Sequence, residues 1–469
     1  MKSKLFALVL IMLLSFNLMA WNMNDNMRFH GFISQSFLIS QGNDFLVPNS
    51  QEGSHELNEL GFTAQSNLTP KLRVGFQLLS RDFGDIDNNQ TKVDWAFADY
   101  RWRDFLGVRF GKAKMPFGLY NESRDTDILR PMALLPQSIY DEHYRSYFVS
   151  YQGTGLYGSI FAGGLGTFDY NLYTGSINFN EDQVIMNVTN DLSNQLMENY
   201  FYNASQLALK QTTMQDTIYP DSLFSSSHSF EPYEYTNARM QDIDALMGGT
   251  LFWNINADPI PLMDNLKVGY SYVKVDLDFL GGERQGSYTV YDPAGNPIPQ
   301  ASDEMTITKR DGGVPTRFAY SLEYTFRRLT LAAEYAQHEL DLNFYDENDE
   351  EIAGFDRKDN YYYLLASFLL KDKFTISVLY DYIDLNEMTF TTSQGETDLK
   401  EALGYEDWQS ERTDIGFGLR YDINFNWTLK AEYHMMNGTA KVYSSILNPQ
   451  DDDPEEDWSY GLIKASYNF

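Results

Sequence analysis

The segment TDIGFGLRY (residues 413–421) alternates apolar side chains with small or charged ones. Ile415, Phe417 and Leu419 share one face of an extended strand, because successive side chains of a strand point to opposite sides. The final segment, GLIKASYNF (residues 461–469), repeats the alternation and ends on a phenylalanine. This pattern is typical both of half-buried strands in soluble sandwiches and of membrane β-barrels.

The lengths of the connections distinguish a membrane barrel from a soluble sandwich. Alternating segments recur along the chain, and we expect strands near residues 29–39, 58–67, 72–79, 92–102, 105–113, 151–162, 167–176, 246–255, 266–278, 316–326, 329–339, 360–369, 374–383, 411–421, 427–436 and 459–469. Every second connection is short, whereas those in between are long and polar. Outer-membrane barrels have short turns at one rim and long loops at the other. The sequence therefore predicts an all-β fold, a transmembrane antiparallel β-barrel of about 16 strands.

The composition excludes several other classes of protein. The 469 residues carry 66 acidic and 35 basic side chains, a net charge of −31, and no cysteine. Without cysteine there are no disulfides, thiolate metal sites or cysteine nucleophiles. The strong negative charge repels phosphate backbones, so we expect no nucleic-acid partner. After residue 20, no apolar run approaches the ~18 residues that a transmembrane helix needs.

The first twenty residues differ from the rest of the chain. Two lysines precede an unbroken apolar run at residues 5–14, and Ala20 offers a small residue for cleavage. These features predict a signal peptide, residues 1–20, followed by an outer-membrane barrel over residues 21–469 in a Gram-negative cell envelope. An N-terminal membrane anchor is the weaker alternative, because this apolar run is too short to span a bilayer.

Two connections stand out. The one at about residues 114–150 contains three prolines, which prevent continuous strand pairing, and it is rich in apolar residues. An external loop would expose those residues to water at about 25 cal/mol per Å². We therefore expect this third long connection to fold inward as a constriction loop. The connection at about residues 177–245 is predicted to be a long external loop with helical character near residues 188–210.

A family resemblance supports this interpretation. The run GKAKMPFGLYNESRD (residues 111–125), followed by Arg-Pro at residues 130–131 and Leu-Pro at residues 135–136, resembles bacterial porins related to the phosphate-selective O and P porin family. The resemblance implies a sixteen-stranded passive diffusion channel, commonly a homotrimer, surrounded by outer-membrane lipid and lipopolysaccharide. Small hydrophilic solutes or ions would be its cargo. Phosphate selectivity is not carried over, because the basic ladder of those pores cannot be matched residue by residue.

Charged side chains near this loop are candidates for the pore constriction. On strand faces and at the loop start we expect Arg73, Arg109, Lys112 and Lys114, and on the loop itself Glu122, Arg124, Asp125, Asp127 and Arg130. Opposed rows of charge across a narrow gap create a transverse field that sorts ions and orients dipolar solutes.

The ion preference stays open at this point. Residues 101–114 contain five basic residues and one acid in an acidic chain, which favours an anion-attracting throat. Alternatively, Arg101 and Arg103 belong to a turn and meet only solvent. The strand at residues 92–102 also has two possible facings, with Val93 outward or Tyr100 outward, and a β-bulge would reconcile them.

Two other functions are alternatives to the channel. The six histidines are scattered, and neither an HExxH nor a GxSxG motif occurs, so we expect no enzyme, no catalytic residue, no metal and no cofactor. The pairs His338 with Glu334 and His434 with Glu432 leave a barrel hydrolase as an alternative. An adhesin without an open pore is another, given the long external loop. The acidic loops at residues 82–89, 346–351 and 451–457 are either solvated or bridged by cations to lipopolysaccharide.

Overall fold

The computed structural model describes residues 27–84, 87–177, 183–215, 224–232, 237–239, 246–256, 263–280, 284–312, 316–346, 348, 350–392, 395–398, 400, 406–442 and 454–469. The predicted signal peptide, residues 1–20, lies outside these ranges and stays a prediction. Part of each acidic loop also lies outside them.

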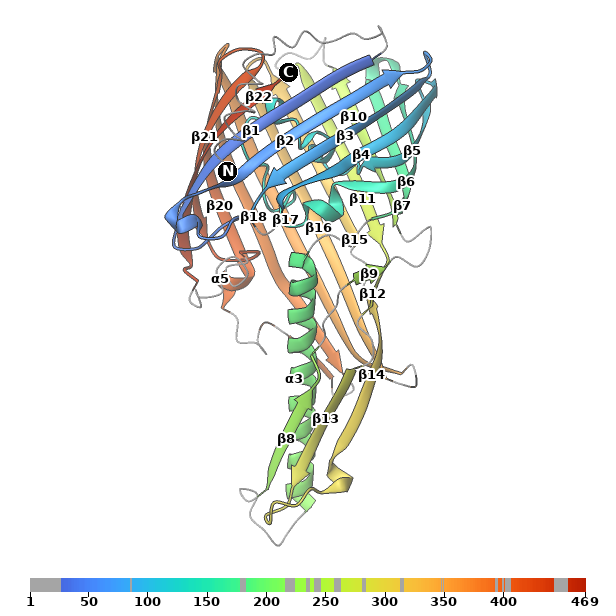
Figure 1. Ribbon diagram of the computed structural model, residues 1–469, viewed down its shortest axis with the longest axis vertical. Coiled ribbons are helices and arrows are strands. Elements are labelled where there is room, and N and C mark those ends of the chain that lie inside the picture. Colours follow the sequence, from blue (N-terminus) through green and yellow to red (C-terminus); the bar gives the residue numbers. More distant parts are fainter. Residues whose placement is uncertain are drawn as a thin grey trace.

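Sixteen antiparallel strands close into a barrel (Figure 1). In order around the wall they are β1 (Met27–Gln41), β2 (Ser54–Asn67), β3 (Leu72–Asp82), β4 (Asn88–Arg103), β5 (Leu106–Lys114), β6 (Ser150–Phe161), β7 (Thr167–Ser176), β10 (Leu246–Asn256), β11 (Asn265–Val275), β15 (Thr316–Phe326), β16 (Leu329–Asp346), β17 (Glu351–Lys371), β18 (Phe374–Thr392), β20 (Glu411–Asp422), β21 (Trp427–Asn437) and β22 (Asp457–Asn468). The pairing of β1 with β22 closes the wall, so each of the sixteen described wall strands has a hydrogen-bonded neighbour on both sides. The predicted fold class is confirmed, and each predicted segment corresponds to one strand.

The wall has an apolar outer face and a polar inner face. On β15, Tyr320 is 56% exposed and Leu322 is 44% exposed, whereas Ala319 and Ser321 on the opposite face are buried. The same alternation on β20 exposes Ile415, as the pattern predicts. In a lipid bilayer this exposed outer face contacts acyl chains, which remove it from water.

A pair of arginine substitutions on β15 should distinguish the two faces. Leu322→Arg places a charge against lipid and should lower the free energy of unfolding by about 2–4 kcal/mol near the bilayer midplane. Glu323→Arg, one residue later on the inner face, is the matched control and should cost much less. Urea unfolding of the two variants in lipid vesicles, followed by tryptophan emission, measures both values. Equal losses would contradict the assigned facing.

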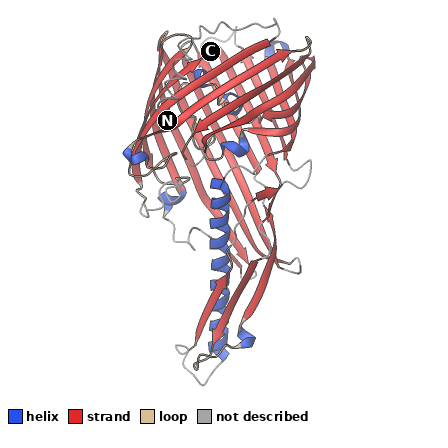
Figure 2. Cartoon of the chain, viewed as in Figure 1, coloured by secondary structure: helices blue, strands red, loops and turns tan. Residues whose placement is uncertain are grey.

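The two rims of the barrel differ. Tight turns such as Arg327–Arg328 and Asp372–Lys373 lie at the rim where the chain ends at Phe469, since β22 runs toward that rim. At the opposite end an arm projects from the wall (Figures 1 and 2). The arm contains α3 (Gln183–Gln215), β8 (Ser225–Phe230), β13 (Arg284–Tyr291) and β14 (Asp303–Gly312). The helix predicted near residues 188–210 is therefore confirmed within a longer one.

The remaining elements are short. Three further strands, β9 (Asn237–Arg239), β12 (Leu277–Leu280) and β19 (Gly395–Asp398), pair beyond the barrel wall. The short helices are α2 (Arg145–Phe148), α5 (Asp407–Ser410) and the 3-10 turns at Ser50–Glu52, Asn121–Ser123, Asp127–Leu129, Gly163–Leu165 and Pro299–Ala301. In the part of the chain that the structure describes, no helix is both long enough and apolar enough to cross a bilayer.

A β-bulge reconciles the two facings of β4. The β3–β4 register shifts between Gln77 and Leu78, and both Asp94 and Trp95 are consequently buried on the inner side. Before the bulge Val93 is exposed on the outer face, and after it the outer face carries Tyr100. The bulge thereby directs two successive side chains into the lumen.

Candidate functional site

The segment Met115–Val149, here called the inner segment, lies inside the barrel. Its backbone N–H groups donate hydrogen bonds to inward-facing side chains of three strands: Gly118 to Ser271 of β11 at 2.9 Å, Leu119 to Glu334 of β16 at 2.9 Å, and Ser138 to Asp381 of β18 at 3.0 Å. The β1–β2 connection also turns inward, where Phe45 packs in one buried cluster with Leu134 of the inner segment. Two connections therefore fill part of the lumen.

A first charged cluster ties the start of the inner segment to its end. The Asp125 carboxylate accepts hydrogen bonds from Lys114 and Arg145, and Lys114 also pairs with Asp94 of β4 at 2.6 Å. Burial raises the pKa of Asp125, but the two adjacent cations outweigh that effect and hold the pKa well below its usual range. Asp125 is therefore ionised and bridges two cations at neutral pH.

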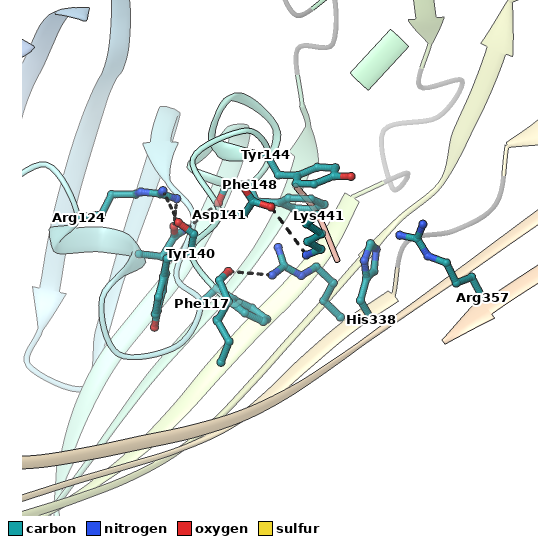
Figure 3. Close-up of a pocket in the computed structure, with 12 residues that line it drawn as sticks. Phe117, Arg124, Tyr140, Asp141, Tyr144, Phe148, His338, Arg357 and Lys441 are labelled. Atoms are coloured by element: carbon teal, nitrogen blue, oxygen red, sulfur yellow. Dashed lines mark hydrogen bonds and ion pairs between the residues drawn. The ribbon is translucent and has the colours of Figure 1, made fainter. Parts of the chain in front are cut away.

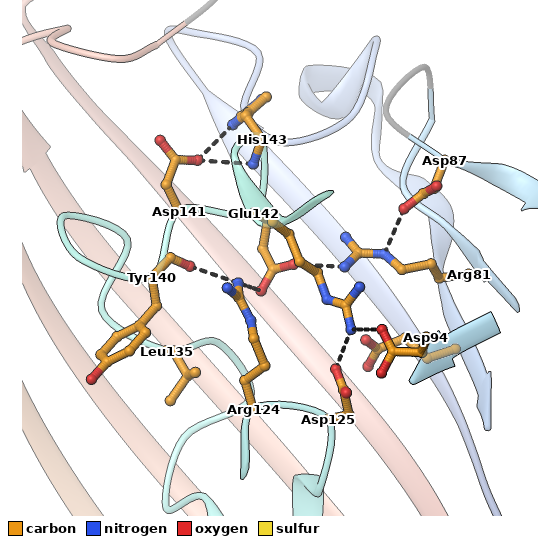
Figure 4. A network of polar contacts seen from close by, with 12 residues as sticks. Arg81, Asp87, Asp94, Arg124, Asp125, Leu135, Tyr140, Asp141, Glu142 and His143 are labelled. Carbon is orange, nitrogen blue, oxygen red and sulfur yellow. Dashed lines mark hydrogen bonds and ion pairs between the residues drawn. The ribbon is translucent and has the colours of Figure 1, made fainter. Parts of the chain in front are cut away.

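A second cluster surrounds Glu142 (Figure 4). The Glu142 carboxylate lies 2.9 Å from the guanidinium of Arg124 and 2.9 Å from that of Arg81, and Arg81 also reaches Asp87 at 3.1 Å. Burial raises the pKa of Glu142, but the neighbouring guanidiniums, chiefly that of Arg124, lower it by more than burial raises it. The pKa of Glu142 therefore lies below its ordinary range. The inner segment is thereby paired to β3.

A third cluster surrounds Asp127 and joins the inner segment to β21 and β22. Its carboxylate pairs with Arg130 at 2.8 Å, with Lys430 of β21 at 3.0 Å and with Lys464 of β22 at 3.3 Å, and it accepts a hydrogen bond from Ser466 at 2.8 Å. Burial raises the pKa of Asp127, yet the three cations hold it well below its usual range.

Five of the nine predicted constriction residues belong to these clusters: Lys114, Arg124, Asp125, Asp127 and Arg130. All five are buried. The sequence suggested opposed rows of charge facing each other across a gap, but these five side chains instead pair at close range and anchor the inner segment. Their charges are compensated locally, so they contribute little field to an open passage.

Sequence reasoning missed the partners that complete the clusters: Arg81, Asp94, Glu142, Arg145, Lys430 and Lys464. Strand parity could have placed Lys430 and Lys464 on the inner face. Nothing in the sequence indicates which inward residues meet Asp127, because that depends on closure of the barrel.

Three other predicted residues are at least partly accessible, Arg73 and Arg109 on the wall and Glu122 on the inner segment. Arg73 lies 2.9 Å from Asp99, and Arg109 lies 3.3 Å from Asp99 and 3.9 Å from Glu122. Arg109 and Glu122 line a cavity of about 440 Å³. Thr63, Gln65, Phe97 and the C-terminal Phe469 also line it. This cavity adjoins β1 to β5, on the side of the lumen where the inner segment leaves space.

Lys112, the ninth predicted residue, lies elsewhere. Along β5 its side chain lies on the same face as that of the exposed Phe110 and on the opposite face from that of the buried Ala113. Its Nζ donates a hydrogen bond to the carbonyl of Val93 at 2.7 Å, on the outer face of β4. Its predicted place in the constriction is therefore wrong, because a single-residue error in facing moves a side chain to the opposite side of the wall.

The two histidine pairs weighed for catalysis differ in geometry. His434 lies between Asp414, at 2.8 Å from Nδ1, and Glu432, at 3.5 Å from Nε2. His338 approaches Asp359 at 3.7 Å, whereas Glu334 is occupied by hydrogen bonds from the inner segment. Among the described residues, neither imidazole hydrogen-bonds a serine or threonine hydroxyl, so neither pair has the arrangement of a serine or threonine nucleophile with its base.

Acid should release the inner segment. In the docked segment, the pKa values of the carboxyls of Asp125, Asp127 and Glu142 lie below their ordinary values, which are about 4 in a released segment. The three ionised carboxylates stabilise docking fully above about pH 4. This stabilisation is lost as the pH falls from about 4 toward the lowered pKa values of the docked segment. We expect single-channel conductance to be constant from about pH 7 to about pH 5 and to rise below about pH 4. A transition centred near about pH 6 would mean that other groups control docking.

Comparison with known proteins adds only weak likenesses. No protein-family model matches the sequence, and no curated protein matches it. Among solved structures, OmpF of Salmonella typhi in complex with daunomycin shares 12% identity over 95% of this chain and 98% of that chain, with a TM-score of 0.48. OprB of Pseudomonas putida shares 10% identity over 96% and 95%, with a TM-score of 0.48. The anion-selective porin of Comamonas acidovorans shares 12% over 94% and 99%, with a TM-score of 0.46.

At these identities and TM-scores, the assignment of fold and location rests on the chain itself. The wall is closed and its outer face is apolar. Tight turns gather at one rim and long connections at the other. Closed barrels with these features cross membranes by strands, because all backbone groups are hydrogen-bonded within the wall. The protein is an outer-membrane β-barrel.

Proposed function

We propose that the protein is a porin, a passive diffusion channel for small hydrophilic solutes or ions. The observation that carries this proposal is the cavity of about 440 Å³ inside a closed wall, beside an inner segment that fills the opposite side of the lumen. Polar and charged side chains line this space, as they do in water-filled barrels. The relation to the phosphate-selective O and P porins, which rests on residues 111–125, belongs to the same proposal.

We further propose a weak preference for anions. The Arg73 side chain is 42% exposed, whereas that of Asp99, which pairs with both Arg73 and Arg109, is 3% exposed. Glu122 is the accessible acid on this side, with a side chain that is 49% exposed. The four charges balance in number, but both guanidiniums are more exposed to this space than Asp99 is, and exposed arginines favour anions.

Reversing the charge of Arg109 tests this preference. Arg109→Glu should lower the anion-to-cation permeability ratio by about threefold in 0.1 M salt, which corresponds to two unit charges acting at about 10 Å through screened water. Reversal potentials across a salt gradient in planar bilayers measure the ratio. Arg328→Glu, at an exposed turn, is the matched control and should leave it unchanged. An unchanged ratio in Arg109→Glu would remove Arg109 from the ion path.

Liposome swelling tests the channel itself. Vesicles that contain the protein should swell in isotonic solutions of small sugars, at rates that fall with solute size. Impermeable vesicles would favour the adhesin alternative, for which the arm formed by α3, β8, β13 and β14 is the specific observation. Homotrimer formation and cation bridging of the acidic loops to lipopolysaccharide stay predictions.

A further inference from the structure

A second, much smaller cavity lies between the inner segment and the barrel wall (Figure 3). Its volume of about 20 Å³ is enough for one water-sized species. The wall side carries four basic residues: Arg317 of β15, His338 of β16, Arg357 of β17 and Lys441, which follows β21. The inner segment contributes Phe117, Tyr140, Asp141 and Phe148 to the same lining.

Arg317 has an unusual environment for a buried cation. It is 7% exposed, and its guanidinium lies between two rings, 4.9 Å from the centroid of Phe117 and 4.4 Å from that of Phe148. Within the described ranges its one hydrogen bond runs from Nη2 to the carbonyl of Ile139 at 3.1 Å. Among the described residues, no carboxylate lies within ion-pair distance of it. A guanidinium has five N–H donors, and burial of its charge without a counter-charge is costly.

The other cations of this cavity have acidic partners. Arg357 pairs with Asp359 at 2.9 Å, and Lys441 lies 3.9 Å from Asp141. Arg124, the remaining basic residue of the lining, pairs with Glu142. When each of these cations is matched with its carboxylate partner among the described residues, only the charge of Arg317 has no counter-charge.

Two further observations indicate an incomplete site. The Nε2 atom of His338 is buried without a hydrogen-bond partner in the described part of the chain. Burial also lowers the pKa of Lys441 to about 8, with Asp141 opposing the shift only in part. The Asp141 carboxylate also accepts a hydrogen bond from the backbone N–H of His143 at 2.9 Å and lies 3.1 Å from Nδ1 of the same histidine, so Lys441 shares it with two other groups.

We propose that this cavity binds one small monovalent anion of the chloride class, held by Arg317 together with Lys441 and an N–H group of His338. Its single negative charge matches the uncompensated charge of Arg317. A cavity of this volume favours a small anion over a bulky one. Because the cavity is bounded by the wall on one side and by the inner segment on the other, it exists only while the segment is docked. This inference concerns a bound ion and does not depend on whether solutes pass through the barrel.

Bromide provides a direct probe, because it replaces chloride and scatters anomalously. Crystals of the full-length mature protein in detergent, grown with sodium bromide in place of sodium chloride, should show an anomalous peak inside this cavity, beside the Arg317 guanidinium. The peak should be absent in Arg317→Met and present in the matched control Arg328→Met, whose exposed arginine lies at a turn. No peak in the wild type, or a peak that persists in Arg317→Met, would overturn the proposal.

A solution measurement covers the case in which Arg317→Met fails to fold. Replacing gluconate by chloride at constant ionic strength should slow tryptic cleavage of the inner segment in the wild type, because an ion that binds only the docked form stabilises it. Lys441→Met should weaken this chloride effect severalfold, and Arg328→Met should retain it. Cleavage that does not depend on chloride in the wild type, or an undiminished effect in Lys441→Met, would argue against the site.

Discussion

Replacing Glu142 with glutamine should detach the inner segment from the barrel wall. In the wild type the Glu142 carboxylate neutralises the guanidiniums of Arg81 and Arg124, each at 2.9 Å, and all three residues are buried. Loss of that charge leaves Arg124 without a carboxylate, and removal of one partner from a buried pair costs about 3–5 kcal/mol. The strand ladders of the wall are untouched, so the loss falls on docking of the segment.

Trypsin provides a sensitive measurement, because the inner segment carries arginines that are buried while it is docked. In lipid vesicles, Glu142→Gln should be cleaved within the segment much faster than the wild type, and its single-channel conductance should be larger and noisier. Glu122→Gln is the matched control: it removes a half-exposed carboxylate of the same segment, 3.9 Å from its cation, and should leave the cleavage rate unchanged. Equal cleavage of the wild type and Glu142→Gln would show that this pair does not hold the segment.

Replacing Asp127 with asparagine should have an effect at least as large. Its carboxylate is shared by Arg130, Lys430 and Lys464, so the substitution leaves three cations together in a buried space. Lys464 retains Glu59 at 2.8 Å, but Lys430 keeps only backbone carbonyls, those of Asp127 and Met132. The uncompensated charge should cost about 3–5 kcal/mol and push the segment away from β21 and β22.

Hydrogen exchange measured by mass spectrometry would locate that change. In Asp127→Asn, amides of the inner segment around residues 127–135 should lose protection, whereas amides of β21 and β22 should keep theirs. Asp104→Asn, at a fully accessible turn, is the control and should match the wild type. Unchanged protection in Asp127→Asn would mean that apolar contacts, such as those of Leu134, hold this part of the segment.

These two variants also test the idea that the clusters are anchors. If they line the ion path instead, Glu142→Gln and Asp127→Asn should alter ion selectivity without altering cleavage or exchange. If they anchor the segment, cleavage and conductance should change together. The accessible charges of Arg73, Arg109 and Glu122 would then set selectivity on their own.

Strand positions are well predicted from sequence because alternation is a local property. All sixteen wall strands lie where the period-two pattern places them, and the tight turn at Arg327–Arg328 follows directly from their spacing. The main shortfall concerns strand length: β17 begins at Glu351, well before the predicted residue 360. Beyond the lipid the outer face no longer needs to be apolar, so the alternation fades while strand pairing continues.

The sequence predicts only in part which side chains face the lumen. Parity alone places Arg73 and Arg109 on the inner face and Lys112, like Phe110, on the outer face, but it could not reveal the bulge at Asp94 and Trp95. A bulge inserts one residue, so every side chain after it points to the opposite side of the wall. Where inner and outer residues are of similar types, the alternation in the sequence does not show the position of the bulge.

By itself, the sequence determined the class of fold, the number of wall strands and the unusual character of residues 114–150. Only the tertiary structure decided which charges meet. Asp127 pairs with Lys430 and Lys464, about three hundred positions away, because β22 closes onto β1 and brings the ends of the chain beside the inner segment. Ion pairing depends on distances of a few ångströms in a water-poor space, and those distances exist only once the wall has closed.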